Sequence, residues 1–542
     1  MPILFHSSRY SLIITLIWAL LTASVIFTSI QFCDGRLIYT LDDPYIHMKV
    51  AQTILQGGYG VNLSEYSSPS SSALYPLMLA GADLLGMGSA GPLILNLIAG
   101  AGAVYLGSLF LERLVLGNDV TGKSALFLYP LGVLLIFAVS AVALPMTGLE
   151  HSWHVFLVVA ALFGLSEMLS AQGGVSRGLI AAIVLIPLVR FEGVAFSCAA
   201  ILALALTGHW KAALTAMALM TVSLVTYGAI MSRLGLPLLP GSVLLKSNAA
   251  TAVVDSRGYF SIARAILGNL IGKLSETGGT SKTGSLNQPQ GILLLLMIVL
   301  MFRGWALTPA GLERRNSAVI AAVASFGLIA HILGGKFGWF ARYEVYAVAL
   351  GLLAVLFTLR YSIRESVARR DWNVLIVMLL AVAIVVIPYL EATLVTPLAS
   401  RGIYEQQFQM HRFVTDFYRE PVAVNDLGWV SYKNDAFVLD LEGLGSEPVR
   451  RSRMTGTYGA TQMAEITAHY GIGLVMIYES WFSSVAPSWR RIAVMHTKSV
   501  TSASGDVSFF VTPDADIGRV TKALADFQSS LPRRVTLEID QL

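Results

Sequence analysis

Long apolar segments separated by short polar ones dominate the chain up to residue 398. A helix needs about 20 apolar residues to cross the roughly 30 Å hydrocarbon core of a bilayer. Segments that approach this pattern predict membrane-spanning helices at 10–33, 91–111, 124–143, 152–169, 178–189, 193–206, 212–232, 291–302, 318–333, 345–359 and 373–390. We therefore predict an α-helical polytopic membrane protein with about 11 spans.

A further apolar segment, 73–86, is too short to span the bilayer and contains Asp83. Apolar stretches of about 10–14 residues are typical of interfacial or re-entrant helices. Counting this segment as a span would also reverse the side of every later loop. We expect it to lie at the outer membrane surface.

The pattern changes near residue 399, where charged residues become frequent. Residues 404–419 have helical spacing, and strand-like stretches follow at 421–425, 436–441, 474–478, 492–496 and 507–512. Helical patterns at 461–470 and 516–527 lie between and after these stretches. Alternating strands and helices predict a small α/β domain. We expect a transmembrane domain at 1–398, whose first outer loop is 34–90, and an extracytoplasmic α/β domain at 399–542.

Composition supports a membrane protein and excludes several other classes. Hydrophobic residues make up 55% of the chain and charged residues only 13%, about half of the roughly 25% that is typical of soluble domains. The net charge of +4 provides no basic surface for nucleic acid. The two cysteines, Cys33 and Cys198, are too few for a disulfide framework or a zinc site.

The positions of lysine and arginine indicate the orientation of the chain. Cytoplasmic loops of membrane proteins are enriched in these residues. With a cytoplasmic N-terminus the basic loops fall on the inside, above all the one at 360–370, which holds four arginines. An odd number of spans then puts the C-terminal domain outside. We predict a multi-pass protein of the inner (plasma) membrane with a periplasmic or extracellular C-terminal domain.

The first outer loop contains an acidic pair, Asp42 and Asp43, just before Pro44. Aspartate and proline are both favoured at a helix N-terminus, and apolar residues at positions 46, 50 and 54 give the following helix one apolar face. One carboxylate is enough for a helix cap. Two adjacent carboxylates therefore also allow acid–base chemistry or binding of a divalent cation. The serines at 67–72 could form a linker or a row of hydroxyls for a sugar or phosphate.

Further charged residues lie near the predicted outer ends of spans. Glu150 precedes a span and could cap it. Arg190 and Glu192 interrupt an apolar stretch, where they could pair with each other or face a cavity. Lys246 and Arg342 are cations on the outer side, and they could bind a phosphate or extend to lipid headgroups.

The order of these motifs resembles that of the GT-C superfamily of integral-membrane glycosyltransferases, including bacterial arabinofuranosyltransferases and the lipid A aminoarabinose transferase. The segments that carry the resemblance are Leu41-Asp42-Asp43-Pro44-Tyr45-Ile46, 66–75, Thr147-Gly148-Leu149-Glu150, Arg190-Phe191-Glu192-Gly193, Arg342-Tyr343, 425–429 and 439–444. Two departures stand out. Phe191 replaces the usual proline, and Ser67-Ser68-Pro69 stands where the aminoarabinose transferase has Glu-Lys-Pro.

The resemblance implies a GT-C-like fold and a hexosyl- or pentosyltransferase. It implies transfer of a sugar, with inversion, from a polyprenyl-phosphate donor to a cell-envelope glycan or glycolipid acceptor on the outer face. It places the general base in the first outer loop, where we choose Asp42, with Asp43 capping the helix, orienting Asp42 or holding a cation. Glu150 would form a second acidic wall. The expected ligands of the donor phosphate are Lys246, Arg342 and Arg190.

Two other functions remain open from the sequence. A polysaccharide polymerase or ligase would share the chemistry, but its large outer loop usually lies late in the chain. A transporter (flippase) for lipid-linked sugars would also place charges at membrane depth. Such transporters are often built from repeated halves, and this sequence contains no internal repeat. The order and the sidedness of the motifs therefore favour the glycosyltransferase.

Overall fold

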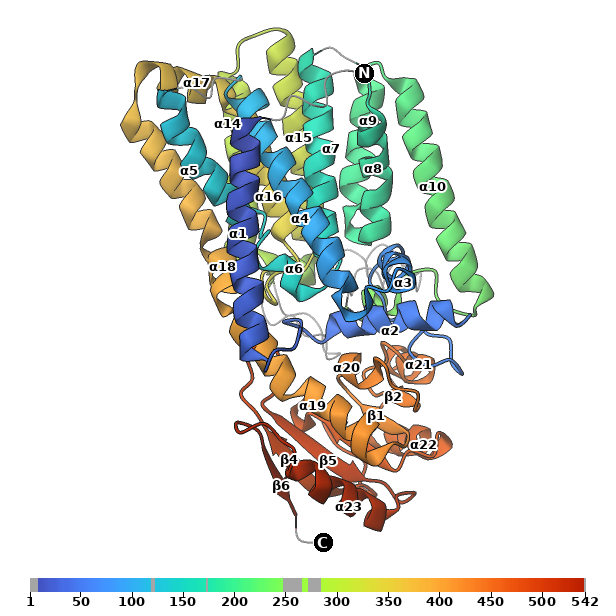
Figure 1. Ribbon diagram of the computed structural model, residues 1–542. Coiled ribbons are helices and arrows are strands. Elements are labelled where there is room, and N and C mark those ends of the chain that lie inside the picture. Colours follow the sequence, from blue (N-terminus) through green and yellow to red (C-terminus); the bar gives the residue numbers. More distant parts are fainter. Residues whose placement is uncertain (1–7, 118–121, 172–173, 247–265, 272–283, 541–542) are drawn as a thin grey trace.

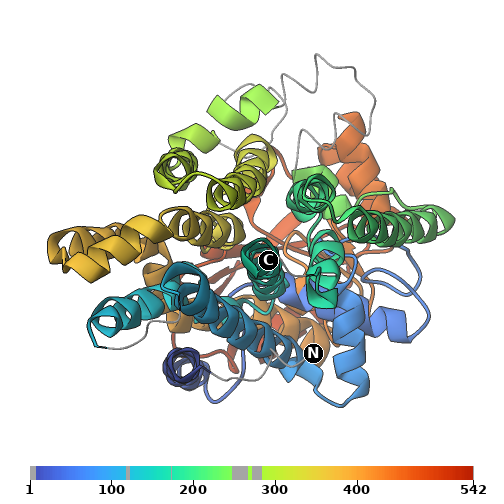
Figure 2. The ribbon, with the colours of Figure 1, turned by 90° about the horizontal axis from the view of Figure 1, so that it is seen from above.

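A helical bundle and a smaller α/β domain make up the protein, as seen in the computed structural model of residues 8–117, 122–171, 174–246, 266–271 and 284–540. The bundle forms the upper part of the molecule in Figure 1, and the α/β domain lies at its lower end. Seen from above in Figure 2, the helices stand side by side over the α/β domain.

Each predicted span coincides with a helix of the bundle. These helices are α1 (Arg9–Phe32), α4 (Gly91–Phe110), α5 (Lys123–Ala138), α7 (His151–Ala171), α8 (Arg177–Val189), α9 (Val194–Leu206), α10 (Trp210–Arg233), α14 (Pro289–Leu307), α15 (Leu312–Gly334), α16 (Val345–Thr358) and α18 (Trp372–Glu405). Within the described residues, seven helices are long and apolar enough to cross a membrane. An eighth candidate is the pair of α16 and α17 (Arg360–Arg369), which is bent by 60° at the break. The prediction of a polytopic helical membrane protein is confirmed.

The outer faces of the bundle suit lipid rather than water. In the apolar 18-residue stretch of α10 only 17% is buried inside the protein, whereas the corresponding share in α7 is 72%. Large apolar side chains stand exposed on the outer helices, for example Leu20 on α1, Val222 on α10 and Ile384 on α18. Exposing such side chains to water costs about 25 cal/mol per Å² of apolar surface. A bilayer around the bundle removes this cost.

Two short helices lie between the bundle and the α/β domain (Figure 1). They are α2 (Asp43–Leu55) and α3 (Tyr75–Leu84). α3 has only 10 residues, so the apolar segment at 73–86 does not form a helix long enough to span a bilayer. α2 has Pro44 in its first turn, but the side chain of Asp42 makes no capping hydrogen bond. The acidic pair is therefore not explained by helix capping at Asp42.

The α/β domain contains a six-stranded mixed sheet with the strand order β2-β1-β3-β5-β4-β6. Its strands are β1 (Val422–Val424), β2 (Val438–Asp440), β3 (Leu474–Ile477), β4 (Arg490–His496), β5 (Asp506–Val511) and β6 (Thr536–Ile539). β1 pairs in parallel with β2 and β3, whereas the other pairs are antiparallel. The helices of this domain include α21 (Glu447–Thr455), α22 (Ala460–His469) and α23 (Ile517–Gln528). The predicted α/β domain is present, and β6 is an additional strand that we did not predict.

The junction between the two parts is a continuous helix. α18 contains 34 residues and runs through the expected boundary at 398/399 before α19 (Gln407–Arg412) begins. The first outer loop and the α/β domain also share a hydrophobic core, in which the ring centroids of Tyr45 and Trp429 lie 4.0 Å apart. These contacts hold the α/β domain against the end of the bundle.

Asp42 provides the polar part of this contact. Its carboxylate accepts hydrogen bonds from the backbone N–H groups of Gly428 (2.6 Å) and Trp429 (2.8 Å). A Cβ atom at Gly428 would lie 2.1 Å from the carbonyl oxygen of Asp42, so this close approach requires glycine. Asp42 therefore joins the first outer loop to the α/β domain.

Asp426 shares this buried site and makes the contact sensitive to pH. Burial raises the pKa of both carboxyls, and the charge of Asp426 raises the pKa of Asp42 further. A carboxyl whose pKa is raised on folding stabilises the protein at low pH, and this stabilisation is lost as the pH rises through the folded-state pKa. We expect the unfolding temperature to fall between pH 5 and pH 8.

Asp426→Asn should weaken this pH dependence and raise the unfolding temperature at pH 8, because the amide keeps an oxygen for Gln407 and Tyr478 but adds no charge. Thermal unfolding of the purified protein at both pH values measures the effect. The matched control is Asp526→Asn, which changes an exposed carboxylate on α23. Equal pH dependence in wild type and Asp426→Asn would contradict the interpretation.

Candidate functional site

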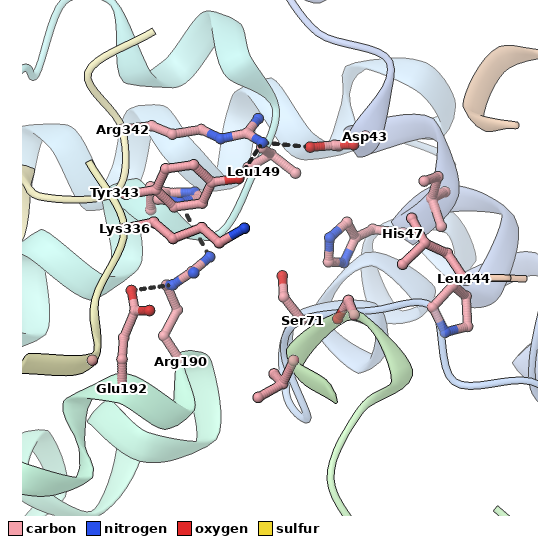
Figure 3. A pocket seen from close by; sticks show the side chains of 16 residues that line it. Asp43, His47, Ser71, Leu149, Arg190, Glu192, Lys336, Arg342, Tyr343 and Leu444 are labelled. Atoms are coloured by element: carbon pink, nitrogen blue, oxygen red, sulfur yellow. Dashed lines mark hydrogen bonds and ion pairs between the residues drawn. The ribbon is translucent and has the colours of Figure 1, made fainter. Parts of the chain in front are cut away.

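A pocket of about 100 Å³ lies where the end of the bundle meets α2 and the α/β domain (Figure 3). Its charged and polar lining comes from segments far apart in the sequence: the start of α2, the serine-rich segment at 67–72, the break between α8 and α9, and the loop between α15 and α16. The polar and charged residues of this lining include Asp43, His47, Ser71, Arg190, Lys336 and Arg342. Leu444 from the α/β domain completes the wall.

Asp43 and Arg342 form an ion pair inside the pocket. The distance between Oδ2 of Asp43 and Nη2 of Arg342 is 2.6 Å, although 299 positions separate the two residues in the sequence. The side chain of Arg342 is 3% exposed, whereas that of Asp43 is 30% exposed. The guanidinium also lies over the ring of Tyr343, 4.9 Å from its centroid. The structure thus holds the partly exposed carboxylate of Asp43 beside a fixed cation.

Asp42 does not line this pocket. Its two carboxylate oxygens are bound to the backbone of the α/β domain, whereas the next side chain points to Arg342. The geometry therefore favours Asp43 over Asp42 as the residue that meets a ligand. The two carboxylates thus have different partners, the backbone of the α/β domain for Asp42 and Arg342 for Asp43. Among the described residues, no group of three or more His, Cys, Asp or Glu side chains could hold a metal ion.

Arg190 lies at the centre of a buried network of ion pairs. Its Nη1 donates to Oε1 of Glu150, and its Nε donates to Oε1 of Glu192, both at 2.8 Å. The predicted pair of Arg190 and Glu192 is therefore formed, and both residues also line the pocket. A buried charge is stable only when it is paired. Two carboxylates satisfy this requirement for Arg190.

Glu150 is buried behind the pocket and contacts residues that line it. Its side chain is fully buried and does not line the pocket. It accepts a hydrogen bond from Ser71 Oγ (2.7 Å) and lies 3.7 Å from Nε2 of His47. In place of the expected acidic wall of the pocket, Glu150 is a buried residue that contacts both His47 and Arg190.

The serine-rich segment is ordered by its own hydrogen bonds, so it is not a flexible linker. Ser72 Oγ accepts a hydrogen bond from the backbone N–H of Tyr75 at the start of α3 (2.9 Å). The backbone N–H groups of Ala73 and Leu74 donate to the carbonyl of Leu188 at the end of α8. These bonds place Ser71 at the pocket.

Two residues of the pocket, His47 and Lys336, were not among the predicted site residues. His47 follows Asp43 by four positions on α2, which places both on the same face of the helix. Lys336 lies in the same outer loop as Arg342. Helical periodicity and the shared loop were the signals available in the sequence. The side chain of Lys246, by contrast, lies outside the described part of the structure.

The loop that carries Lys336 and Arg342 has an unusual backbone. Its residues Trp339, Phe340 and Ala341 all have positive φ values, of 47°, 68° and 51°. Such conformations cost of order 1–3 kcal/mol each and persist only where the surrounding structure holds them. Glu344 contributes, because its Oε2 accepts a hydrogen bond from the backbone N–H of Gly338 (2.9 Å). Burial raises the pKa of Glu344 to about 7.

Comparisons with known proteins give the following matches. The model of a domain of unknown function (DUF8728) matches residues 400–510. No curated protein sequence matches the chain. The chain is similar to the crystal structure of ArnT from Cupriavidus metallidurans bound to undecaprenyl phosphate, with a TM-score of 0.49 and 11% identity over 92% of this chain and 98% of that chain. For the apo state of ArnT the TM-score is 0.48 and the identity 12%, with the same coverage.

A third solved structure is the Archaeoglobus fulgidus oligosaccharyltransferase in complex with Zn and sulfate. Its TM-score is 0.45 at 12% identity, and the match covers 96% of this chain and 74% of that chain. All three TM-scores are below 0.5 and all identities are below 25%.

Proposed function

We propose that this protein is a membrane glycosyltransferase. It would move a sugar from a polyprenyl-phosphate donor to a hydroxyl of a cell-envelope glycan or glycolipid, with inversion at the anomeric carbon. The observation that carries the proposal is the pocket in which the accessible carboxylate of Asp43 lies among three cations, Arg190, Lys336 and Arg342. Transfer from a sugar phosphate needs both: a base for the acceptor hydroxyl and positive charge for the leaving phosphate.

Asp43 is the proposed general base. An acceptor hydroxyl is a weak nucleophile, and a carboxylate within hydrogen-bond reach can take its proton as the attack proceeds. We assign this role to Asp43 because it lines the pocket, whereas the sequence led us to choose Asp42. The ion pair with Arg342 holds the carboxylate in place.

The cations of the pocket would stabilise the leaving group. During transfer the bond between the anomeric carbon and the phosphate oxygen breaks, and its electron pair stays on the phosphate. The new bond joins the anomeric carbon to the acceptor oxygen, whose proton passes to Asp43. Fixed cations aimed at the phosphate stabilise the charge that develops there. No step of the proposed reaction runs through a divalent cation.

The position of the pocket suits a lipid-linked donor. Its lining comes from the start of α2, the break after α8 and the end of α15, among other segments, and Figure 1 shows α2 at the end of the bundle that faces the α/β domain. The phosphate of a lipid would lie at this level, with its prenyl chain in the bilayer. The distribution of basic loops supports an orientation with this end on the outer side of the inner (plasma) membrane. Leu444 lines the pocket, which supports a role of the α/β domain in covering the site.

A transfer assay tests the proposal. The purified protein is incubated with a panel of polyprenyl-phosphate pentoses and hexoses and with glycan and glycolipid acceptors from the cell envelope. We expect release of free polyprenyl phosphate together with labelling of an acceptor for at least one donor, and none for nucleotide sugars. Failure with every donor, together with no binding of undecaprenyl phosphate, would refute the proposal.

A further inference from the structure

His47 has no role in the mechanism described so far, although its ring points into the pocket (Figure 3). It is 4% exposed and lies on the same face of α2 as Asp43. Its Nδ1 is 3.0 Å from Oγ of Ser70, and its Nε2 is 3.7 Å from Oε2 of Glu150. The edge of the ring contacts Tyr75. Both ring nitrogens thus have a defined polar neighbour.

These neighbours are compatible with a proton on each ring nitrogen. Ser70 Oγ lies within hydrogen-bond distance of the carbonyl of Ser72 (2.9 Å) and of Nδ1 of His47 (3.0 Å), and its single hydrogen can go to either. When the hydrogen goes to Ser72, the oxygen accepts from His47 and Nδ1 carries a proton. A bare lone pair on Nε2 would be repelled by the carboxylate of Glu150, which favours a proton there as well. With both nitrogens protonated, His47 is a cation.

A cation at His47 changes the charge balance of the pocket. The charged groups around it come from the start of α2, the turn before α7, the break between α8 and α9, and the loop after α15. They are Asp43, Glu150 and Glu192 on the acidic side and Arg190, Lys336 and Arg342 on the basic side. His151 accepts a hydrogen bond from Arg190 with its Nε2, which leaves it neutral. Among these described residues the three acids match the three cations, and a second proton on the His47 ring adds one positive charge to them.

We propose that the imidazolium of His47 is the titratable cation that binds the leaving polyprenyl phosphate. The inference rests on the proposed function and deepens it. The donor is a phosphodiester with one negative charge, whereas the released monoester carries a second ionisation with a pKa near 6. His47 keeps its protons during transfer and offsets the charge that the phosphate gains. Glu150 and Ser70 hold the ring in the orientation that this role requires.

Binding of undecaprenyl phosphate to purified wild type, His47→Gln and His47→Lys tests the proposal. Each affinity is measured between pH 5.5 and 8.5. Glutamine keeps hydrogen-bonding groups but not the charge, so we expect binding at pH 5.5 to weaken by about tenfold, the loss of one nearby positive charge in the pocket. The ratio of wild-type to His47→Gln affinity should fall toward one as the pH rises, which removes the titration of the phosphate itself from the comparison.

His47→Lys should keep tight binding over the whole range, because lysine stays protonated. His469→Gln, on α22 and outside the pocket, is the matched control and should behave as wild type. A ratio that does not change with pH would overturn the role of His47. If wild type binds no undecaprenyl phosphate at any pH, the proposed function fails and this role fails with it. Failure of the His47 role alone and failure of the proposed function therefore give different results.

Discussion

Asp43→Asn should reduce the rate of sugar transfer by about 10²–10⁴-fold, the usual effect of removing a general base. Asparagine has nearly the same size and begins a helix as well as aspartate does, so α2 should still form. Its amide oxygen can still accept a hydrogen bond from Arg342, but it cannot take the acceptor's proton. The loss should therefore appear in kcat, with a much smaller change in KM for the donor.

The matched control is the neighbouring substitution Asp42→Asn. It places an NH₂ group against the backbone N–H groups of Gly428 and Trp429 and should lower the unfolding temperature. The folded fraction should retain kcat within a few-fold of wild type. Steady-state kinetics and thermal unfolding on the same preparations separate the two effects. If Asp42→Asn loses turnover while Asp43→Asn keeps it, the base is Asp42 and our assignment is wrong.

Arg342→Gln should lower kcat/KM by about 10²–10³-fold, as expected when a fixed donor to the developing charge is removed. The substitution removes a cation from the phosphate and also leaves Asp43 without its charged partner. Arg342→Lys should recover part of the activity, because lysine restores the charge but not the planar geometry of the guanidinium. Steady-state kinetics with a fixed acceptor concentration measure both variants.

Arg360→Gln is the corresponding control. Arg360 is as deeply buried as Arg342 and is also paired with a carboxylate, Glu313, at 2.6 Å. It is the first residue of α17, which Figure 1 shows at the end of the bundle away from α2. We expect lower stability and an unchanged kcat/KM in the folded protein. Equal losses in Arg342→Gln and Arg360→Gln would show that the effect is one of stability and would remove Arg342 from the site.

The sequence by itself determined the helical segments and most strands, because their signals are local. The expected spans coincide with helices from α1 to α18, and among the described residues seven of these helices are long and apolar enough to cross a membrane. The short segment at 73–86 was separated from them by Asp83 and by the side on which the later basic loops would fall. Five strands of the α/β domain were also predicted, but β6 was missed although Val535, Leu537 and Ile539 alternate with polar residues.

Only the tertiary structure decided which of these residues meet and which carboxylate faces the pocket. Asp42 and Asp43 are equivalent in a sequence pattern, yet one binds the backbone of the α/β domain and the other pairs with Arg342. Glu150 was expected at the site and is instead buried behind it, between Arg190 and His47. Local propensity describes where a helix begins, whereas the direction of each side chain depends on which distant segment packs against it. A contact across 299 positions therefore exists only in the folded chain.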